Sequence, residues 1–295
     1  MENAIAQDDL LRMEGIEKLF PGVHALNNCR FAIRRGEVHA LVGENGAGKS
    51  TLMKVLTGIY KRDGGTIHYK GKEIDISSPE EAQALGIGII HQELNLMPHL
   101  TVAENIFIGR EPMRGPFLDK KKANEDARRL LNSLRIDIDP TIPCNKLSVA
   151  KQQMVEIAKA LSFDSELLVM DEPSAALTEA EVQELFRFIR DLKKRGHAII
   201  YISHRLDELP QITDRITVMR DGQYVGTVNT ADVTKEQIIS MMVGRVIYEK
   251  PKTKSEVPEG APVILEARNL VANNVKNVSF KLKKGEILGF AGLMG

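Results

Sequence analysis

Nine consecutive residues have the composition of a loop that binds phosphate. They fit the pattern G-x-x-x-x-G-K-[ST] and read Gly43-Glu44-Asn45-Gly46-Ala47-Gly48-Lys49-Ser50-Thr51. The three glycines let the backbone curl until several N–H groups point at one anion. Lys49 is placed to reach the β- and γ-phosphates of a nucleotide, and the Ser50 hydroxyl is placed to ligate Mg²⁺. A glycine-rich turn followed by a chance Lys-Ser is the alternative.

The elements on either side favour the phosphate loop. Residues 37–42 (EVHALV) predict a short buried strand that glycines delimit, and residues 51–60 (TLMKVLTGIY) predict a helix that starts inside the loop. A helix start contributes free N–H groups and the positive end of its dipole to a bound anion. Strand, loop and helix are therefore in the order that nucleotide binding needs.

Polar residues also follow three other predicted buried strands. Gln92 follows residues 87–91, Asp171 and Glu172 follow residues 166–170, and His204 follows residues 198–203. The carboxyl ends of parallel strands share one edge of an open sheet, which is the usual ligand site. There, Asp171 could hold Mg²⁺ and Glu172 could orient or deprotonate an attacking water.

Composition excludes several classes of protein. The chain has 295 residues, 43% of them apolar, with 40 basic and 40 acidic residues, so it has no basic footprint for nucleic acid. Cys29 and Cys144 have no metal-binding spacing and indicate a reducing compartment. The N-terminus lacks a signal-peptide pattern, and no apolar run is long enough for a membrane span. Any membrane role must come through a partner.

The remaining pattern predicts an α/β fold with three parts. Antiparallel strands are expected at residues 10–19, 29–33, 66–69 and 74–76, and a hairpin around Asp221-Gly222. Thr101 opens a helix with a capping box, Ser148 caps the helix expected within residues 145–161, and further helices are expected at 123–134, 179–195 and 233–243. The alternation of strands and helices predicts a parallel core sheet, with an antiparallel subdomain and an inserted helical subdomain at about residues 98–160.

The end of the sequence repeats its beginning. Residues 275–295 align without gaps on residues 26–46, with Phe280, Gly285 and Glu286 matching Phe31, Gly36 and Glu37. We therefore expect a first domain over residues 1–245, a linker over 246–261 and the start of a second, truncated copy over 262–295. Residues from about 263 are expected to be disordered or to pair with the edge of the first domain.

The later motifs carry a family resemblance that covers roughly residues 9–245. Residues 147–152, Leu147-Ser148-Val149-Ala150-Lys151-Gln152, resemble the signature of ATP-binding-cassette (ABC) ATPases, and residues 167–174 (LLVMDEPS) follow at that family's spacing. Gln92 and His204 stand in the family's order. The stretches HQELNL, QQMVEIAKAL and YISHR are similar to the ATP-hydrolysing subunits of bacterial monosaccharide importers, ribose importers in particular.

This resemblance implies a mechanism and residue roles. It makes ATP and Mg²⁺ the ligands, with Ser50, Gln92 and Asp171 at the metal, Glu172, His204 and Gln92 in catalysis, and Phe20 stacked on adenine. A core position is the alternative for Phe20. The other histidines, His24 among them, are interpreted as structural.

The signature departs from the family's Leu-Ser-Gly-Gly-Gln, because Val149 and Ala150 replace both glycines. Thr178 also stands where the family usually has Asp. The family sandwiches ATP between one domain's phosphate loop and the other domain's signature, so these departures argue against symmetric hydrolysis. The present chain is expected to bind ATP with Mg²⁺ but to hydrolyse it poorly by itself.

The resemblance also implies partners. They are the permease subunits of a sugar importer and, indirectly, a sugar-binding protein, which places the chain at the cytoplasmic face of the membrane. A soluble tandem ABC protein that acts on ribosomes is the main alternative, but such proteins carry a long charged linker helix, and here the linker is short and contains proline. DNA-repair ABC proteins insert coiled coils, and no sustained heptads occur between Lys49 and Leu147.

Overall fold

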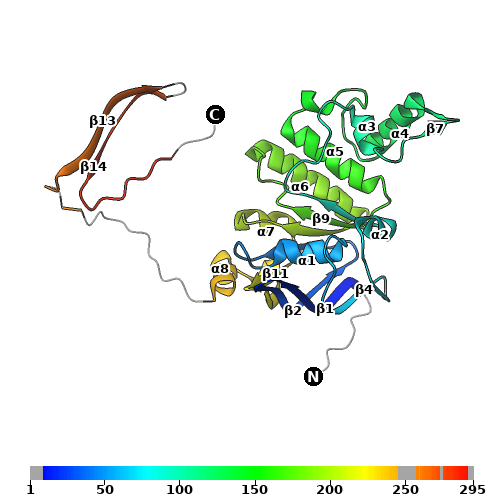
Figure 1. Cartoon of the computed structure of the whole chain (residues 1–295), viewed down its shortest axis with the longest axis horizontal. Helices are drawn as coiled ribbons and strands as arrows, with labels where there is room; N and C mark the ends of the chain where they lie inside the picture. The colour runs from blue at the N-terminus through cyan, green and yellow to red at the C-terminus, as the bar shows by residue number, and fades with distance from the viewer. Residues whose placement is uncertain (1–8, 245–256, 259, 273–274, 292–295) are drawn as a thin grey trace. The chain divides into compact units, whose positions relative to one another are not determined.

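A computed structural model describes residues 9–244, 257–258, 260–272 and 275–291. The chain divides into two compact units, Met1–Val246 and Ile247–Gly295, and each is described by itself. In the first unit the helices α3 and α4 lie at one end and the strands β1, β2 and β4 at the other (Figure 1).

A six-stranded sheet forms the centre of the first unit, in the order β12-β11-β3-β10-β9-β6. Its strands β11, β3, β10, β9 and β6 are parallel, and β12 is antiparallel to β11. The bounds are β3 Val38–Val42, β6 Ile87–Ile90, β9 Leu167–Asp171, β10 Ala198–Ile202, β11 Arg215–Arg220 and β12 Gln223–Asn229. Every residue of β3 and β10 is buried, as continuous apolar runs in a parallel sheet require. The predicted parallel core is confirmed.

Alternate residues of these strands enter two separate cores. Leu41, Ile200 and Ile202 pack with the apolar face of helix α1 (Lys49–Leu56) and with the second sheet. Ala40, Ile199 and Tyr201 pack with helices α5 (Val149–Leu161) and α6 (Glu179–Lys194) on the opposite face. The strand period of two thus fixes both faces of the sheet and holds its edge between two rigid layers.

An antiparallel sheet has the order β2-β1-β4-β5. Its strands are β1 Asp9–Phe20, β2 Val23–Arg34, β4 Gly64–Tyr69 and β5 Lys72–Ile74. The predicted hairpin is present, but the expected second strand at residues 74–76 was wrong. Lys70 and Gly71 both have positive φ (52° and 76°) and make a two-residue turn, so the strand resumes at Lys72.

The inserted helical part contains α3 (Val102–Ile106), α4 (Lys120–Ser133) and α5. The predicted capping box of Thr101 and Glu104 is present, and Ser148 caps α5. A short 3₁₀ turn, η1 (Cys144–Lys146), precedes Ser148, so the helix begins four residues later than Asn145. The sequence did not predict the small hairpin of β7 (Met113–Arg114) and β8 (Phe117–Leu118).

The other helices are short or end early. Helix α1 begins at Lys49 and ends at Leu56, so residues 57–60 of the expected helix lie outside it. The remaining elements are α2 Pro79–Ala84, η2 Leu206–Glu208, α7 Leu209–Ile212, η3 Thr230–Asp232 and α8 Lys235–Val243. Lys49 and Ser50 therefore stand in the first turn of α1, where the backbone N–H groups are free.

The second unit contains a hairpin of β13 (Val263–Ala272) and β14 (Val275–Lys283). The two strands pair with each other, so the expectation of disorder was wrong for residues 263–272 and 275–283. Pairing with the edge of the first unit stays untested. The hairpin repeats β1–β2 in detail. Phe280 pairs with Ala267 as Phe31 pairs with Met13, and both hairpins have a bulge after that pair.

The repeated bulge has the same backbone conformation in both copies. The left-handed residues are Gly15 and Asn28 in the first hairpin and Asn269 and Asn277 in the second. Beyond the strands, Glu286 accepts a hydrogen bond from the N–H of Lys283 at 2.8 Å, and Glu37 accepts one from that of Arg34 at 2.7 Å. These features support the interpretation that a second copy of the domain begins here.

Candidate functional site

The loop of residues 43–51 joins β3 to α1, as the sequence predicts. Two of its glycines are required by space, and one of them also by conformation. A Cβ on Gly43 would lie 2.4 Å from the carbonyl oxygen of Met219, and one on Gly48 would lie 2.9 Å from that of Ala25. Gly48 also has φ +94°, a region that side chains rarely adopt. The loop therefore keeps its curl only with these residues.

Lys49 lies inside this curl. Its Nζ donates hydrogen bonds to the carbonyl oxygens of Gly43 (2.8 Å) and Glu44 (3.0 Å), and the residue is buried. Burial lowers the pKa of the Lys49 ammonium, and the carboxylates of Glu172 and Asp171 oppose that shift. An anion in the loop would add to the effect of these two carboxylates and favour the charged form of the buried lysine.

The three strand ends meet beside the loop. Strands β6, β9 and β10 are neighbours, and Gln92, Glu172 and His204 follow them within two residues. Gln92 Nε2 donates to Glu172 Oε2 at 3.0 Å, and His204 Nδ1 lies 3.1 Å from Glu172 Oε1. The predicted juxtaposition of residues 92, 172 and 204 is present in the structure, and Glu172 is its centre.

Asp171 faces the helix end of the loop. Ser50 Oγ donates to Asp171 Oδ2 at 3.3 Å, so the hydroxyl and the carboxylate predicted to share a metal are adjacent. Burial raises the pKa of Asp171; the Ser50 hydrogen bond opposes the shift and the neighbouring Glu172 adds to it. A divalent cation at this point would relieve both the burial of the charge and the repulsion between the carboxylates.

A cleft of about 530 Å³ joins these groups. It is lined by residues 45–51 of the loop, by Gln92, Asp171 and Glu172 from the strand ends, and by Val23, His24 and Ala25 from β2. His24, which its sequence context indicates to be structural, lies in this wall, and its ring Nε2 lies 2.5 Å from Glu17 Oε2. The cleft offers several free amide N–H groups, one buried ammonium and two carboxylates, which suits a phosphate chain with a cation.

Phe20 is not among the residues that line the cleft. Its ring meets the edge of Tyr60, with centroids 5.2 Å apart, and Lys18 Nζ lies 5.4 Å from its centroid. It ends β1, three residues before the chain enters the cleft wall at Val23. Base stacking by Phe20 remains a prediction.

The signature residues lie apart from the cleft, and none of them lines it. The Ser148 hydroxyl accepts a hydrogen bond from the N–H of Lys151 at 3.4 Å and caps α5. Val149 is 42% exposed and Ala150 is 4% exposed. The branched side chain of Val149 therefore faces outward where the family has glycine. Comparison with Leu-Ser-Gly-Gly-Gln also puts Lys151 in the fifth position, a departure that the sequence analysis did not note.

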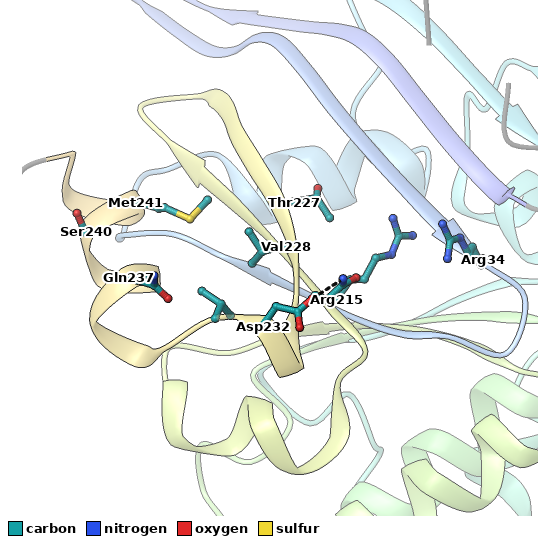
Figure 2. A pocket seen from close by; sticks show the side chains of 10 residues that line it. Arg34, Arg215, Thr227, Val228, Asp232, Gln237, Ser240 and Met241 are labelled. Carbon is teal, nitrogen blue, oxygen red and sulfur yellow. Dashed lines mark hydrogen bonds between the residues drawn. The ribbon is translucent and has the colours of Figure 1, made fainter. Parts of the chain in front are cut away.

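A larger hollow, of about 750 Å³, lies between β12 and α8 and contains none of the predicted site residues (Figure 2). Two of its charged groups already have partners. Arg215 pairs with both oxygens of Glu37 at 2.6 and 2.9 Å, and Asp232 accepts from Asn229 at 2.8 Å. No glycine of the described part of the chain lines the hollow, so it does not offer the curl of backbone N–H groups that the loop provides.

Among the described residues, no group of three or more His, Cys, Asp or Glu side chains could hold a metal by itself. Mg²⁺ is usually bound by one or two carboxylates and completes its shell with phosphate and water, so the adjacent Ser50 and Asp171 suit it. Gln92 as a third ligand stays a prediction. The described helices include none that is long and apolar enough to cross a membrane.

The chain that carries this site is similar to known proteins. Residues 26–175 match a family model described as ABC transporter. The chain is 60% identical over 289 residues to a putative ribose/galactose/methyl galactoside import ATP-binding protein 2 of Burkholderia cenocepacia, which covers 97% of this chain and 56% of that protein. It is 54% identical to a putative ribose/galactose/methyl galactoside import ATP-binding protein 1 of Agrobacterium fabrum, and the match covers 97% of this chain and 57% of that protein. The chain thus spans about half the length of the curated relatives it matches.

Solved structures show the same fold. A nucleotide-free ATP-binding cassette from an ABC transporter superposes with a TM-score of 0.70 at 29% identity, covering 81% of this chain and 98% of that one. The ADP conformation of another such cassette gives 0.69 at 29% identity, covering 80% and 95%.

Proposed function

The chain belongs to the ABC transporter family, and we propose that it is the ATP-binding and ATP-hydrolysing subunit that powers uptake of a monosaccharide through a membrane importer. The names of the relatives support this proposal, since they describe putative import ATP-binding proteins for ribose, galactose and methyl galactoside. Because the chain spans 56% of the length of such a relative, the proposal concerns the activity of a whole protein of that length.

In this proposal the loop residues 43–51 hold the triphosphate through backbone N–H groups, and Lys49 neutralises the β- and γ-phosphates. Ser50, Asp171 and Gln92 hold Mg²⁺, which would neutralise charge on the phosphates. Phe20 supports the adenine. Except for Phe20, which ends β1, each residue is placed by the loop or by a strand end at one edge of the six-stranded sheet.

Glu172 acts on the attacking water. Its carboxylate is fixed on one side by Gln92 and on the other by His204, at 3.0 and 3.1 Å, and this arrangement carries the proposal. A carboxylate that is held at both oxygens can orient a water and accept its proton. His204 also reaches toward the γ-phosphate.

The decisive experiment is Glu172→Gln in the intact protein assembled with its membrane partners. Because general base catalysis contributes about 10²–10⁴-fold, we expect steady-state ATPase activity to fall at least 100-fold while ATP binding is retained. Glu166→Gln, at the residue that precedes the other end of the strand β9, is the control and should keep its activity. Retention of most of the activity by Glu172→Gln would refute the assignment.

The membrane partners are proposed to be permease subunits, supplied with sugar by a separate binding protein, with this chain at the cytoplasmic face of the membrane. The helical part, about residues 98–160, is the proposed docking region. Co-purification of the tagged chain with a sugar permease would support this assignment. Co-sedimentation with ribosomes, and not with membranes, would favour the alternative in which a tandem ABC protein acts on ribosomes.

We further propose that residues 1–245 are one cassette, residues 246–261 a linker, and residues 262 onward the start of a second cassette, as the repeated hairpin supports. The signature of that second cassette would then complete the site built on Lys49 and Glu172. The first signature, with Val149, Ala150 and Lys151, would serve a weaker site. Restoring glycine at 149 and 150 should leave the activity that depends on Glu172 unchanged.

A further inference from the structure

Glu208 is a buried carboxylate to which the mechanism above assigns no role. It is 3% exposed and ends the 3₁₀ turn η2. Its Oε2 accepts hydrogen bonds from the hydroxyls of Tyr201 (2.7 Å), Ser174 (2.8 Å) and Ser203 (3.3 Å), and its Oε1 lies 2.7 Å from Nη1 of Arg205. The three hydroxyl residues are buried as well. One carboxylate therefore gathers three hydroxyl donors and one ion pair.

These donors come from the two segments that carry the catalytic pair. Ser174 lies two residues after Glu172, in the turn that leads to α6, and Ser203 immediately precedes His204. Ser203 Oγ also accepts the N–H of Arg205 at 3.0 Å, which fixes the chain on both sides of His204. Through Ser174 and Ser203, Glu208 thus connects the loop that carries Glu172 to the loop that carries His204.

Glu172 needs such support because its backbone is strained. Its φ is +48°, in the left-handed region, where a residue with a Cβ is disfavoured. Strain of this kind persists only where the surroundings over-determine the conformation. One restraint is the hydrogen bond from the N–H of Glu172 to the carbonyl of Ile202 at 2.9 Å, and the bond between Ser174 and Glu208 is the second.

A buried charged hub also enforces a single arrangement. Hydrogen bonds to an ionised acceptor are roughly twice as strong as neutral ones, and a buried network leaves costly unpaired groups when any member moves. The two loops are therefore coupled, so that a shift of one must displace the other.

We propose that Glu208 is a positioning residue that holds the loops of Glu172 and His204 in one fixed relation, so that the 3.1 Å contact between these two side chains is kept during turnover. The proposal rests on the proposed ATPase function. Glu208 touches neither nucleotide nor water; it acts through Ser174 and Ser203.

The test compares Glu208→Ala and Glu208→Gln with Asp207→Asn, an exposed carboxylate in the same turn that pairs with Lys235. Because a misplacement near 1 Å can lower a rate about 100-fold, we expect Glu208→Ala to lower kcat for ATP hydrolysis by roughly that factor, with the Kd for ATP unchanged. Glu208→Gln keeps an acceptor oxygen and should recover part of kcat. Asp207→Asn should match the unsubstituted protein.

Amide hydrogen exchange gives a second readout that does not depend on hydrolysis. Protection of residues 172–178 and 203–206 should fall in Glu208→Ala and remain in Asp207→Asn. Ser174→Ala and Tyr201→Phe each remove one hydrogen bond to the hub, and they carry the test if Glu208→Ala fails to fold. The effects of Ser174→Ala and Glu208→Gln on kcat should be less than additive, because they interrupt the same connection.

The proposal is overturned if kcat is unchanged, if the Kd for ATP rises as much as kcat falls, or if exchange in both loops is unaffected. Failure of the proposed function looks different. In that case ATPase activity is insensitive to Glu172→Gln, while exchange in the two loops still responds to Glu208.

Discussion

His204 and Gln92 contact opposite oxygens of one carboxylate: the imidazole Nδ1 lies 3.1 Å from Glu172 Oε1, and the amide Nε2 donates to Oε2. Either contact limits rotation of the carboxylate. We therefore expect His204→Ala and Gln92→Ala each to lower kcat roughly 100-fold, because orientation of the base is lost, while ATP affinity persists. Steady-state ATPase assays and equilibrium nucleotide binding measure the two effects. His99→Ala, an exposed histidine that contacts Asn145, should be silent; equal losses in all three variants would contradict the assignment.

Gly46 and Gly48 provide a matched pair in the phosphate loop. Both have positive φ, +84° and +94°, but a Cβ on Gly46 meets nothing within 4 Å, whereas one on Gly48 would lie 2.9 Å from Ala25 O. Both alanine variants carry the backbone penalty, of about 1 kcal/mol, and only Gly48→Ala adds a clash with the backbone. We expect nucleotide affinity to fall further in Gly48→Ala than in Gly46→Ala. Titration with a fluorescent ATP analogue checks the order, and the reverse order would show that the loop relaxes differently.

Asp171→Asn should separate stability from function. Burial raises the pKa of this carboxyl, which means that its charged form is disfavoured in the folded protein. Asparagine removes the charge and keeps an oxygen that can accept from Ser50, so the midpoint of thermal unfolding at pH 7 should rise. The Mg²⁺-dependent part of ATP affinity should fall roughly 10- to 100-fold. Binding in EDTA is the control and should be equal in both proteins.

The buried carboxyl of Glu37 should make the stability of the fold depend on pH. Burial by itself would raise its pKa, but the neighbouring His39 and Arg215 side chains outweigh burial and lower the pKa to about 2. A depressed pKa gives stability that is complete above the unfolded value of 4.5 and is lost as pH falls toward about 2. Urea unfolding should therefore show a decline of the free energy of unfolding within that window.

The matched variants for this prediction are Glu37→Gln and Glu286→Gln. The first leaves Arg215 without its buried carboxylate and should lower the free energy of unfolding at pH 7 by roughly 3 kcal/mol. Glu286 repeats the hydrogen bond to the chain three residues earlier but is half-buried, and its substitution should change stability by no more than about 0.5 kcal/mol. Equal effects would show that the local bond, and not the pairing with Arg215, is what stabilises.

Much of the site could be predicted because it depends on local signals. The loop motif fixes where α1 begins, and buried strands end where polar residues follow them, so Gln92, Glu172 and His204 could be assigned to one edge. Residues whose role depends on distant contacts could not. Glu208 stands in a stretch, RLDEL, that resembles a solvated helical turn, and only the fold brings Ser174 and Tyr201 onto it.

The two hairpins have one further consequence. Strand β1 is flanked by both β2 and β4, whereas the sheet of β13 contains only β14 in the described part of the chain, yet both hairpins bulge at the same pair. The sequence of each hairpin is therefore sufficient to place its bulge, and both hairpins have an asparagine with positive φ there, Asn28 and Asn277. Such a segment is portable: exchanged between the two ends of the chain, it should bring its own curvature with it.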